Sequence, residues 1–164
     1  MAVNEHFPML AFYNRIANER LYESCAQLSD AEYHSQRKGS LGGIHALLNH
    51  MLLADRIWMS RFRGEGKTTP NLATVLYDDF AQLRLARGQE DLSMEEFFAS
   101  ASQSLPETTI SYTNSKGRHC TDRVLNGILH MFNHQTHHRG QVHVMLSQAG
   151  VQPPSLDMHR ILNP

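Results

Sequence analysis

Histidine is the residue type with the clearest chemical potential in this sequence of 164 residues. Eleven histidines occur, and five of them cluster near the C-terminal end: His130, His134, His137, His138 and His143. Imidazole nitrogens suit zinc and nickel as ligands. Whether several of these side chains can share one ion depends on their spacing.

His134 and His138 are four residues apart in a segment with helical periodicity. At ~100° per residue, they lie ~40° apart on one face, one turn above each other. Each imidazole can therefore direct a nitrogen at the same ion. Pairs with this spacing also occur by chance in histidine-rich helices, so a third ligand is needed from another helix.

His50 is the predicted third ligand, because it shares an inward-facing stripe with Leu47, Ala54 and Ile57. Facing helices of a bundle build metal sites from side chains that project into the core in this way. His45, five residues earlier, lies ~140° round the helix and is predicted to point elsewhere.

The other histidines have several interpretations. His130, one turn before His134, is either a fourth ligand or a hydrogen-bond donor behind the ligands. His137 is rotated ~60° from the pair and His143 further still, which favours surface or interface roles. A single inward histidine is more often a hydrogen-bonded core residue than a ligand. Two inward histidines one turn apart, however, would repel each other if charged and need separate partners if neutral, which favours the metal.

Composition excludes several classes of function. Fifteen basic and sixteen acidic residues, without a basic run, argue against nucleic-acid binding. The longest apolar stretches fall far short of the ~20 residues of a membrane-spanning helix, and the N-terminus does not resemble a secretory signal. Cys25 and Cys120 form no C-x-x-C pair, so we expect reduced, hydrophobically packed thiols in a cytoplasmic protein. The motifs H-E-x-x-H, E-x-x-H, G-x-G-x-x-G and G-x-S-x-G, and the Walker loop, are all missing.

Apolar residues at steps of three or four predict four long helices, over residues 5–28, 44–62, 73–105 and 122–149. Gly88 and Ser93 suggest a kink or break in the third helix, which Pro106 should end. Residues 109–113 and 118–121 predict a short hairpin, and Thr121 or Asp122 suits the N-cap of the last helix.

Gly150 fits the C′ position after the last helix. Four long amphipathic helices with short connections predict an all-α fold, a four-helix bundle with a short β-hairpin before the last helix. The whole chain, residues 1–164, should form a single domain.

Three segments resemble the DinB-like proteins, a superfamily of metal-binding four-helix bundles that includes thiol-dependent transferases. Residues 13–22 are similar to the family's opening Y-N-x-W-A-N pattern, with Ile16 in place of the usual tryptophan. Residues 47–58 contain His50 where the family has its first histidine ligand. Residues 133–143 match the N-H-x-x-H-H-R-G-Q signature, whose two ligands fall on His134 and His138.

The resemblance implies a three-histidine site for nickel or zinc, with water in the open positions, and a homodimer. Arg139 and Gly140 are expected at packing or dimer contacts, because a mid-helix glycine costs ~1 kcal/mol relative to alanine and usually permits a close approach.

Three neutral histidines leave a divalent ion its full charge and an open ligand position, as in catalytic sites. The leading hypothesis is a metal-dependent enzyme, either a hydrolase or a transferase that uses a low-molecular-weight thiol. The alternative is a non-catalytic metal-binding stress-response protein, so enzyme status stays open. Asp55 is the nearest carboxylate to the His50 stripe but is expected to face away. The substrate, a small molecule, cannot be deduced from the sequence.

Overall fold

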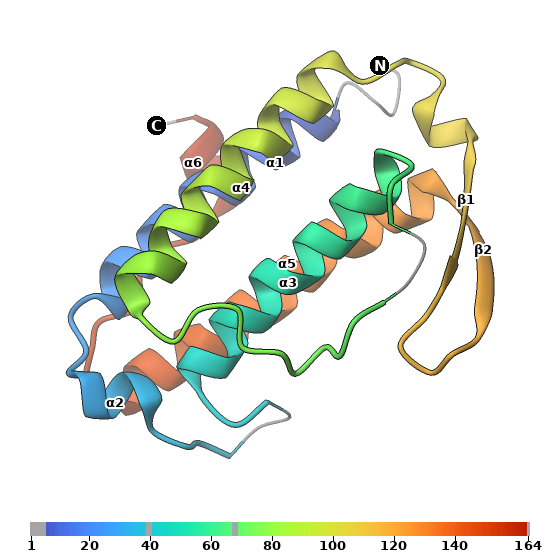
Figure 1. The fold of residues 1–164 in the computed structure, drawn as a ribbon. Coiled ribbons are helices and arrows are strands. Elements are labelled where there is room, and N and C mark those ends of the chain that lie inside the picture. The colour runs from blue at the N-terminus through green and yellow to red at the C-terminus, as the bar shows by residue number, and fades with distance from the viewer. Residues whose placement is uncertain (1–5, 39–40, 67–68, 164) are drawn as a thin grey trace.

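The computed structural model describes residues 6–38, 41–66 and 69–163. Its long helices are α1 (His6–Cys25), α3 (Ile44–Phe62), α4 (Phe80–Ser100) and α5 (Val124–Gln148). α1 packs against α4, α3 packs against α5, and the two pairs face each other (Figure 1). The predicted all-α four-helix bundle is confirmed.

Shorter elements connect and flank these helices. α2 (Asp30–His34) precedes α3, α6 (Met158–Leu162) packs on α1, and a 3-10 turn covers Leu105–Glu107. The predicted hairpin is confirmed as strands β1 (Thr109–Thr113) and β2 (His119–Arg123), paired antiparallel beside the start of α5 (Figure 1). Within the described ranges, no helix has the length and apolar character to cross a membrane.

The first predicted helix ends early. α1 stops at Cys25 rather than at residue 28, and Glu5, where it was predicted to begin, lies outside the described residues. The separate helix α2 follows because Ser29 acts as an N-cap, its side chain accepting a hydrogen bond from the Glu32 backbone N–H at 3.2 Å.

The third predicted helix is shorter than residues 73–105. α4 begins only at Phe80, because Asp79 caps it by accepting a hydrogen bond from the Gln82 backbone N–H at 2.8 Å. The predicted break at Gly88 and Ser93 is wrong, since both lie inside this uninterrupted helix. Residues 101–104 leave the helix before the 3-10 turn that contains Pro106.

The start of the last helix also differs from the prediction. Thr121 and Asp122 belong to β2, where their side chains pair with Ser111 and Tyr112 of β1 rather than capping α5. α5 begins at Val124, without a side-chain cap. Gly150 has a φ of 76°, as the C′ prediction required.

The core consists of two large apolar halves with a layer of buried polar side chains between them, and of a smaller apolar cluster where α6 packs on α1. One half gathers around Leu21, Leu48 and Leu146, and the other around Phe7, Met59 and Phe98. All four long helices contribute to the layer between them, with Asn14, Asn18, Asp55, Arg87, Asp91, Gln135 and Arg139. Because the predicted histidine ligands occupy the same level of α3 and α5, the layer and the candidate site are neighbours.

Candidate metal centre

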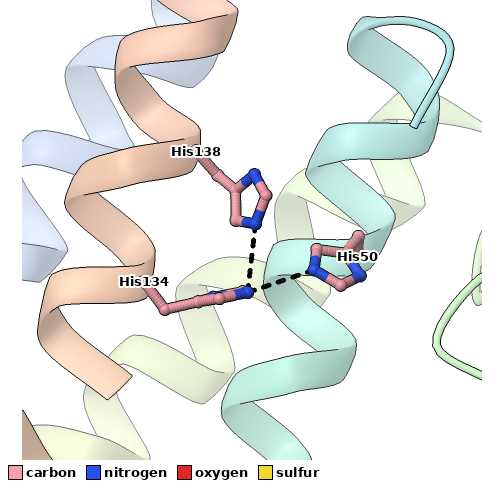
Figure 2. Close-up of side chains that lie close together, drawn as sticks. All are labelled: His50, His134 and His138. Carbon is pink, nitrogen blue, oxygen red and sulfur yellow. Dashed lines mark hydrogen bonds between the residues drawn. The ribbon is translucent and has the colours of Figure 1, made fainter. Parts of the chain in front are cut away.

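The three predicted ligands meet between α3 and α5. His50 comes from α3, His134 and His138 come from α5, and their rings point toward one another (Figure 2). The Nε2 atom of His134 is 3.1 Å from Nε2 of His50 and 3.0 Å from Nε2 of His138. Three nitrogens bound tetrahedrally at zinc–nitrogen distances of ~2.0–2.1 Å are ~3.3 Å apart, so this spacing fits one ion.

Hydrogen bonds on the far side of two rings aim nitrogen lone pairs at the common centre. His50 Nδ1–H donates to the Leu72 carbonyl at 3.0 Å, and His138 Nδ1–H donates to Gln141 Oε1 at 2.7 Å. In a neutral imidazole, protonation of Nδ1 leaves a lone pair on Nε2. Such contacts to a carbonyl or amide oxygen are typical of metal-binding histidines, whose ring orientation they fix.

Hydrogen bonding among three neutral rings leaves one of these close nitrogen contacts without a proton. His134 Nε2 faces two other Nε2 atoms but carries at most one proton, so it can donate to His50 or to His138, not to both. One lone pair would then face another nitrogen without a proton between them. A cation at the centre satisfies all three nitrogens at once.

Burial and the neighbouring rings favour the neutral form of two of these histidines. Burial, followed by the neighbouring His138 and His50, lowers the pKa of His134 to about 3. Burial also lowers the pKa of His138, although its hydrogen bond to Gln141 acts in the opposite direction. Both rings are therefore neutral at pH 7, the form in which imidazole binds metals.

The remaining histidines contribute no donor atom to this cluster. His130 is not among the residues whose donor atoms meet; its ring centroid lies 5.7 Å from that of His134 and 5.4 Å from that of Trp58. His45 points away as predicted, toward His34 and Asp78 in a second, more exposed group. There its Nε2 already lies 3.2 Å from the Tyr77 carbonyl oxygen.

The loop between α3 and α4 supplies the oxygen that orients His50. Asn49, which is buried, accepts hydrogen bonds from the backbone N–H groups of Leu76 and Tyr77 at 2.8 and 2.9 Å and donates to the Tyr77 carbonyl at 3.0 Å. One side chain thus replaces the helical hydrogen bonds that were predicted for this segment. The loop is held along α3, with Leu72 opposite His50.

Asp55 faces away from the histidines, as expected. Its carboxylate is fully buried and forms an ion pair with Arg87 at 2.7 Å, while Arg87 also lies 2.9 Å from Asp91. Asp91 accepts hydrogen bonds from Asn14 and Asn18, two residues of the motif in α1. Asp55 is therefore part of the polar layer and is not placed to act as a base at the metal centre.

Arg139 belongs to the same polar layer, whereas Gly140 is not at a close packing contact within the described part of the chain. Arg139 is buried and donates to the side-chain oxygens of Asn14 and Asn18. A Cβ placed on Gly140 would meet nothing within 4 Å, whereas one on Gly127 would lie 2.9 Å from the Trp58 ring. Gly127, which the sequence analysis did not single out, is the glycine that permits a close approach of α5 to α3.

A cavity of about 190 Å³ opens beside the cluster. His50 and His134 line it, together with the aromatic side chains of Trp58 and Tyr112 and the basic side chain of Arg61. Sequence reasoning missed Arg61, although residues 50, 54, 57, 58 and 61 continue one stripe of α3 at helical spacing. It also missed the oxygen atoms that hydrogen-bond to His50 and His138. The Leu72 carbonyl is a backbone group, which no residue type reveals, and the role of Gln141 is recognisable only after His138 has been identified as a candidate ligand.

Comparisons with known proteins agree with the fold and with the sequence motifs. The model of the DinB family matches residues 1–164. Protein DinB of Bacillus subtilis is 26% identical over 147 residues, which cover 84% of this chain and 83% of the relative. The crystal structure of a DinB-like protein from Bacillus cereus superposes with a TM-score of 0.64 at 18% identity, over 85% of this chain and 89% of that one. With a family match along its whole length, the chain belongs to the DinB family.

Proposed function

We propose that the protein binds one divalent ion, zinc or nickel, through His50, His134 and His138 and uses it in catalysis. One observation carries the proposal: three Nε2 atoms converge while the Nδ1–H groups of two of the rings are held by oxygen acceptors. Nothing in a bundle of this size requires an ion for folding, because its two apolar core halves are already extensive.

The cavity favours catalysis over a purely structural role. Structural zinc sites are closed by four protein ligands, whereas catalytic sites keep a position open to substrate or water. Here three protein side chains meet at the candidate centre, and two of them line a cavity. A bound divalent ion would supply Lewis acidity, which lowers the pKa of a coordinated water or thiol.

Thiol transfer fits the cavity better than hydrolysis does. In the described part of the chain, no aspartate, glutamate or cysteine lines the cavity, so a carboxylate base for hydrolysis has no candidate. Burial raises the pKa of Cys25 to about 12, which makes that thiol a poor nucleophile. We therefore propose that a small-molecule thiol enters the cavity and loses its proton to solvent. Its sulfur then forms a carbon–sulfur bond with a second substrate, whose leaving group departs with the electron pair of the bond that breaks.

Hydrolysis remains the second candidate, because His130 lines the cavity and could exchange protons with a water there. Homodimer formation, which the family resemblance implied, stays a prediction that sedimentation equilibrium would test.

Elemental analysis of the purified protein tests the metal proposal. We expect about one zinc or nickel per chain in the wild type, and its loss in His134→Ala and His138→Ala. His143→Ala is the matched control, because this histidine is on the same helix but outside the cluster. Metal that survives both ligand substitutions, or that is absent after growth in zinc and nickel, would contradict the proposal.

Activity measurements then separate the candidate reactions. Metal-loaded protein is assayed with glutathione and a chlorodinitrobenzene for thiol transfer, and with a nitrophenyl ester for hydrolysis. Thiol transfer that disappears on chelation and in His134→Ala supports the first candidate. If chelation instead lowers the melting temperature strongly while neither activity is detected, the ion is structural and the non-catalytic alternative holds.

A further inference from the structure

Arg61 is a buried cation without a carboxylate partner. Its relative exposure is 5%, yet it takes part in none of the arginine–carboxylate pairs found among the described residues. A guanidinium has five N–H donors. The hydrogen bond of Arg61 goes from Nη2 to Thr69 Oγ1, and its Nε–H has no partner.

The other two buried arginines of the bundle are satisfied differently. Arg87 lies against Asp55 and Asp91, and Arg139 donates to three side-chain oxygens. Both belong to the polar layer, whose acceptors come from the protein itself. Arg61 is the exception among them, and it lines the cavity beside the histidine cluster.

Aromatic rings hold the Arg61 guanidinium in place. Its central carbon lies 3.7 Å from the ring centroid of Tyr112 and 4.6 Å from that of Trp58. The nearby carboxylate of Asp122 accepts a hydrogen bond from the Tyr112 hydroxyl at 2.7 Å, and it attracts Arg61 without forming an ion pair with it. Cation–π contacts fix the position of the charge but do not neutralise it, and burial lowers the pKa of Arg61.

We infer that this cavity binds the carboxylate of a small molecule, with Arg61 as its counter-ion. Planar, delocalised guanidinium groups pair with carboxylates through parallel hydrogen bonds. The lining contains no acidic side chain among the described residues to repel an anion, and its aliphatic and aromatic walls (Ala54, Ile57, Trp58, Leu72) suit an apolar stem. A carboxylate monoanion matches the single charge of this guanidinium, whereas a phosphate dianion carries about twice that charge.

This inference rests on the proposed function for its meaning: the carboxylate would belong to a substrate of the metal centre, and Arg61 would position that substrate next to His50 and His134. Arg61 would select for acidic substrates over neutral ones of the same shape, because a neutral ligand leaves the buried charge unpaired.

Trp58 provides a direct readout, because it is the only tryptophan of the chain and lines the cavity. Its fluorescence is followed during titration with butyrate, with uncharged butyramide as the matched ligand, in chloride-free buffer. We expect a saturable change with butyrate, at least ten-fold weaker binding of butyramide, and at least ten-fold weaker butyrate binding in Arg61→Gln. Arg63→Gln, an exposed arginine of the same region, should bind butyrate like the wild type.

The titration is run on the protein as purified and again after chelation, which separates this inference from the metal proposal. Butyrate binding that persists without metal and depends on Arg61 supports the inference even if the metal proposal fails. Binding that disappears on chelation but survives Arg61→Gln would overturn it, as would equal affinity for butyrate and butyramide or tighter binding of inorganic phosphate. Arg61→Lys, which keeps the charge, should retain part of the affinity; should Arg61→Gln fail to fold, this variant and the two matched ligands still decide.

Discussion

Replacing Arg87 with methionine should destabilise the bundle severely, and by an amount that depends on pH. Arg87 is 2% exposed and compensates two carboxylates, Asp55 at 2.7 Å and Asp91 at 2.9 Å. Methionine fills similar space but leaves both acids buried without a cation. Breaking a buried ion pair in this way typically costs ~3–5 kcal/mol.

A second estimate gives the same magnitude. Burial already raises the pKa of Asp91 to about 6 and raises that of Asp55, despite the attraction of Arg87. Without the guanidinium, folding would require protonation, and protonating an aspartate with an unfolded pKa of ~3.9 costs ~4 kcal/mol at pH 7. When the folded-state pKa of an acid is raised, the protein loses stability as the pH rises above the unfolded-state pKa of that acid. The cost should therefore fall by ~1.4 kcal/mol for each unit by which the pH is lowered, for each carboxyl group protonated on folding.

Urea unfolding of the wild type and Arg87→Met, followed by circular dichroism at pH 7 and pH 5, measures both effects. We expect a loss of at least ~3 kcal/mol at pH 7 that shrinks clearly at pH 5. Arg63→Met is the control, because Arg63 is exposed and forms no ion pair among the described residues, although it donates a hydrogen bond to Ser93. A loss below ~1 kcal/mol, or one that is equal at both pH values, would refute the view that Arg87 compensates buried charge.

Four further substitutions test other parts of the structure. Gly140→Ala should raise the free energy of unfolding by up to ~1 kcal/mol in a urea titration, since its Cβ would meet no atom within 4 Å among the described residues. Gly127→Ala should lower the free energy of unfolding, because its Cβ would lie 2.9 Å from Trp58. Equal effects of the two substitutions would contradict the assignment of Gly127 as the glycine at the close contact. His134→Gln should reduce the loss of stability of the metal-free protein at low pH. Because the folded-state pKa of His134 is about 3, this residue lowers the free energy of unfolding by up to ~1.4 kcal/mol per pH unit as the pH drops from its unfolded-state pKa near 6.5 toward 3. Asn49→Ala should weaken zinc binding ~10–100-fold in a chelator competition, because the loop that orients a ligand loses its anchor; unchanged affinity would show that the anchor is dispensable.

The sequence was sufficient to predict the bundle and the clustering of three histidines, because both depend on helical periodicity. His134 and His138 share a face at any position of α5, and the stripe that contains His50 had to face inward for α3 to bury its apolar residues. α3 was predicted with the bounds that it has, Ile44–Phe62. Periodicity indicates which side of a helix faces the core, so these predictions needed no knowledge of which other helices pack against it.

What the sequence could not show depends on contacts between distant segments. The helix predicted from residue 73 fails because Asn49, on another helix, binds the backbone of residues 76 and 77. Thr121 and Asp122 do not cap the last helix, because their side chains form hydrogen bonds with residues of the opposite strand of the hairpin. That Arg61 forms no ion pair among the described residues likewise becomes visible only when its surroundings in space are known.

The ligands and the polar layer are coupled through neighbouring residues of one helix. On α5, His134 is followed by Gln135, which donates to the Met51 carbonyl of α3 at 3.1 Å, and His138 by Arg139, which donates to α1. Successive residues point ~100° apart, so one of each pair faces the candidate site and the other the bundle interior. These interior contacts fix the rotation of α5, and metal sites tolerate errors of only ~0.5 Å. We therefore expect Gln135 and Arg139 to influence the affinity of the proposed metal site without touching the ion, because they keep two imidazoles aimed at the same point as a third from α3.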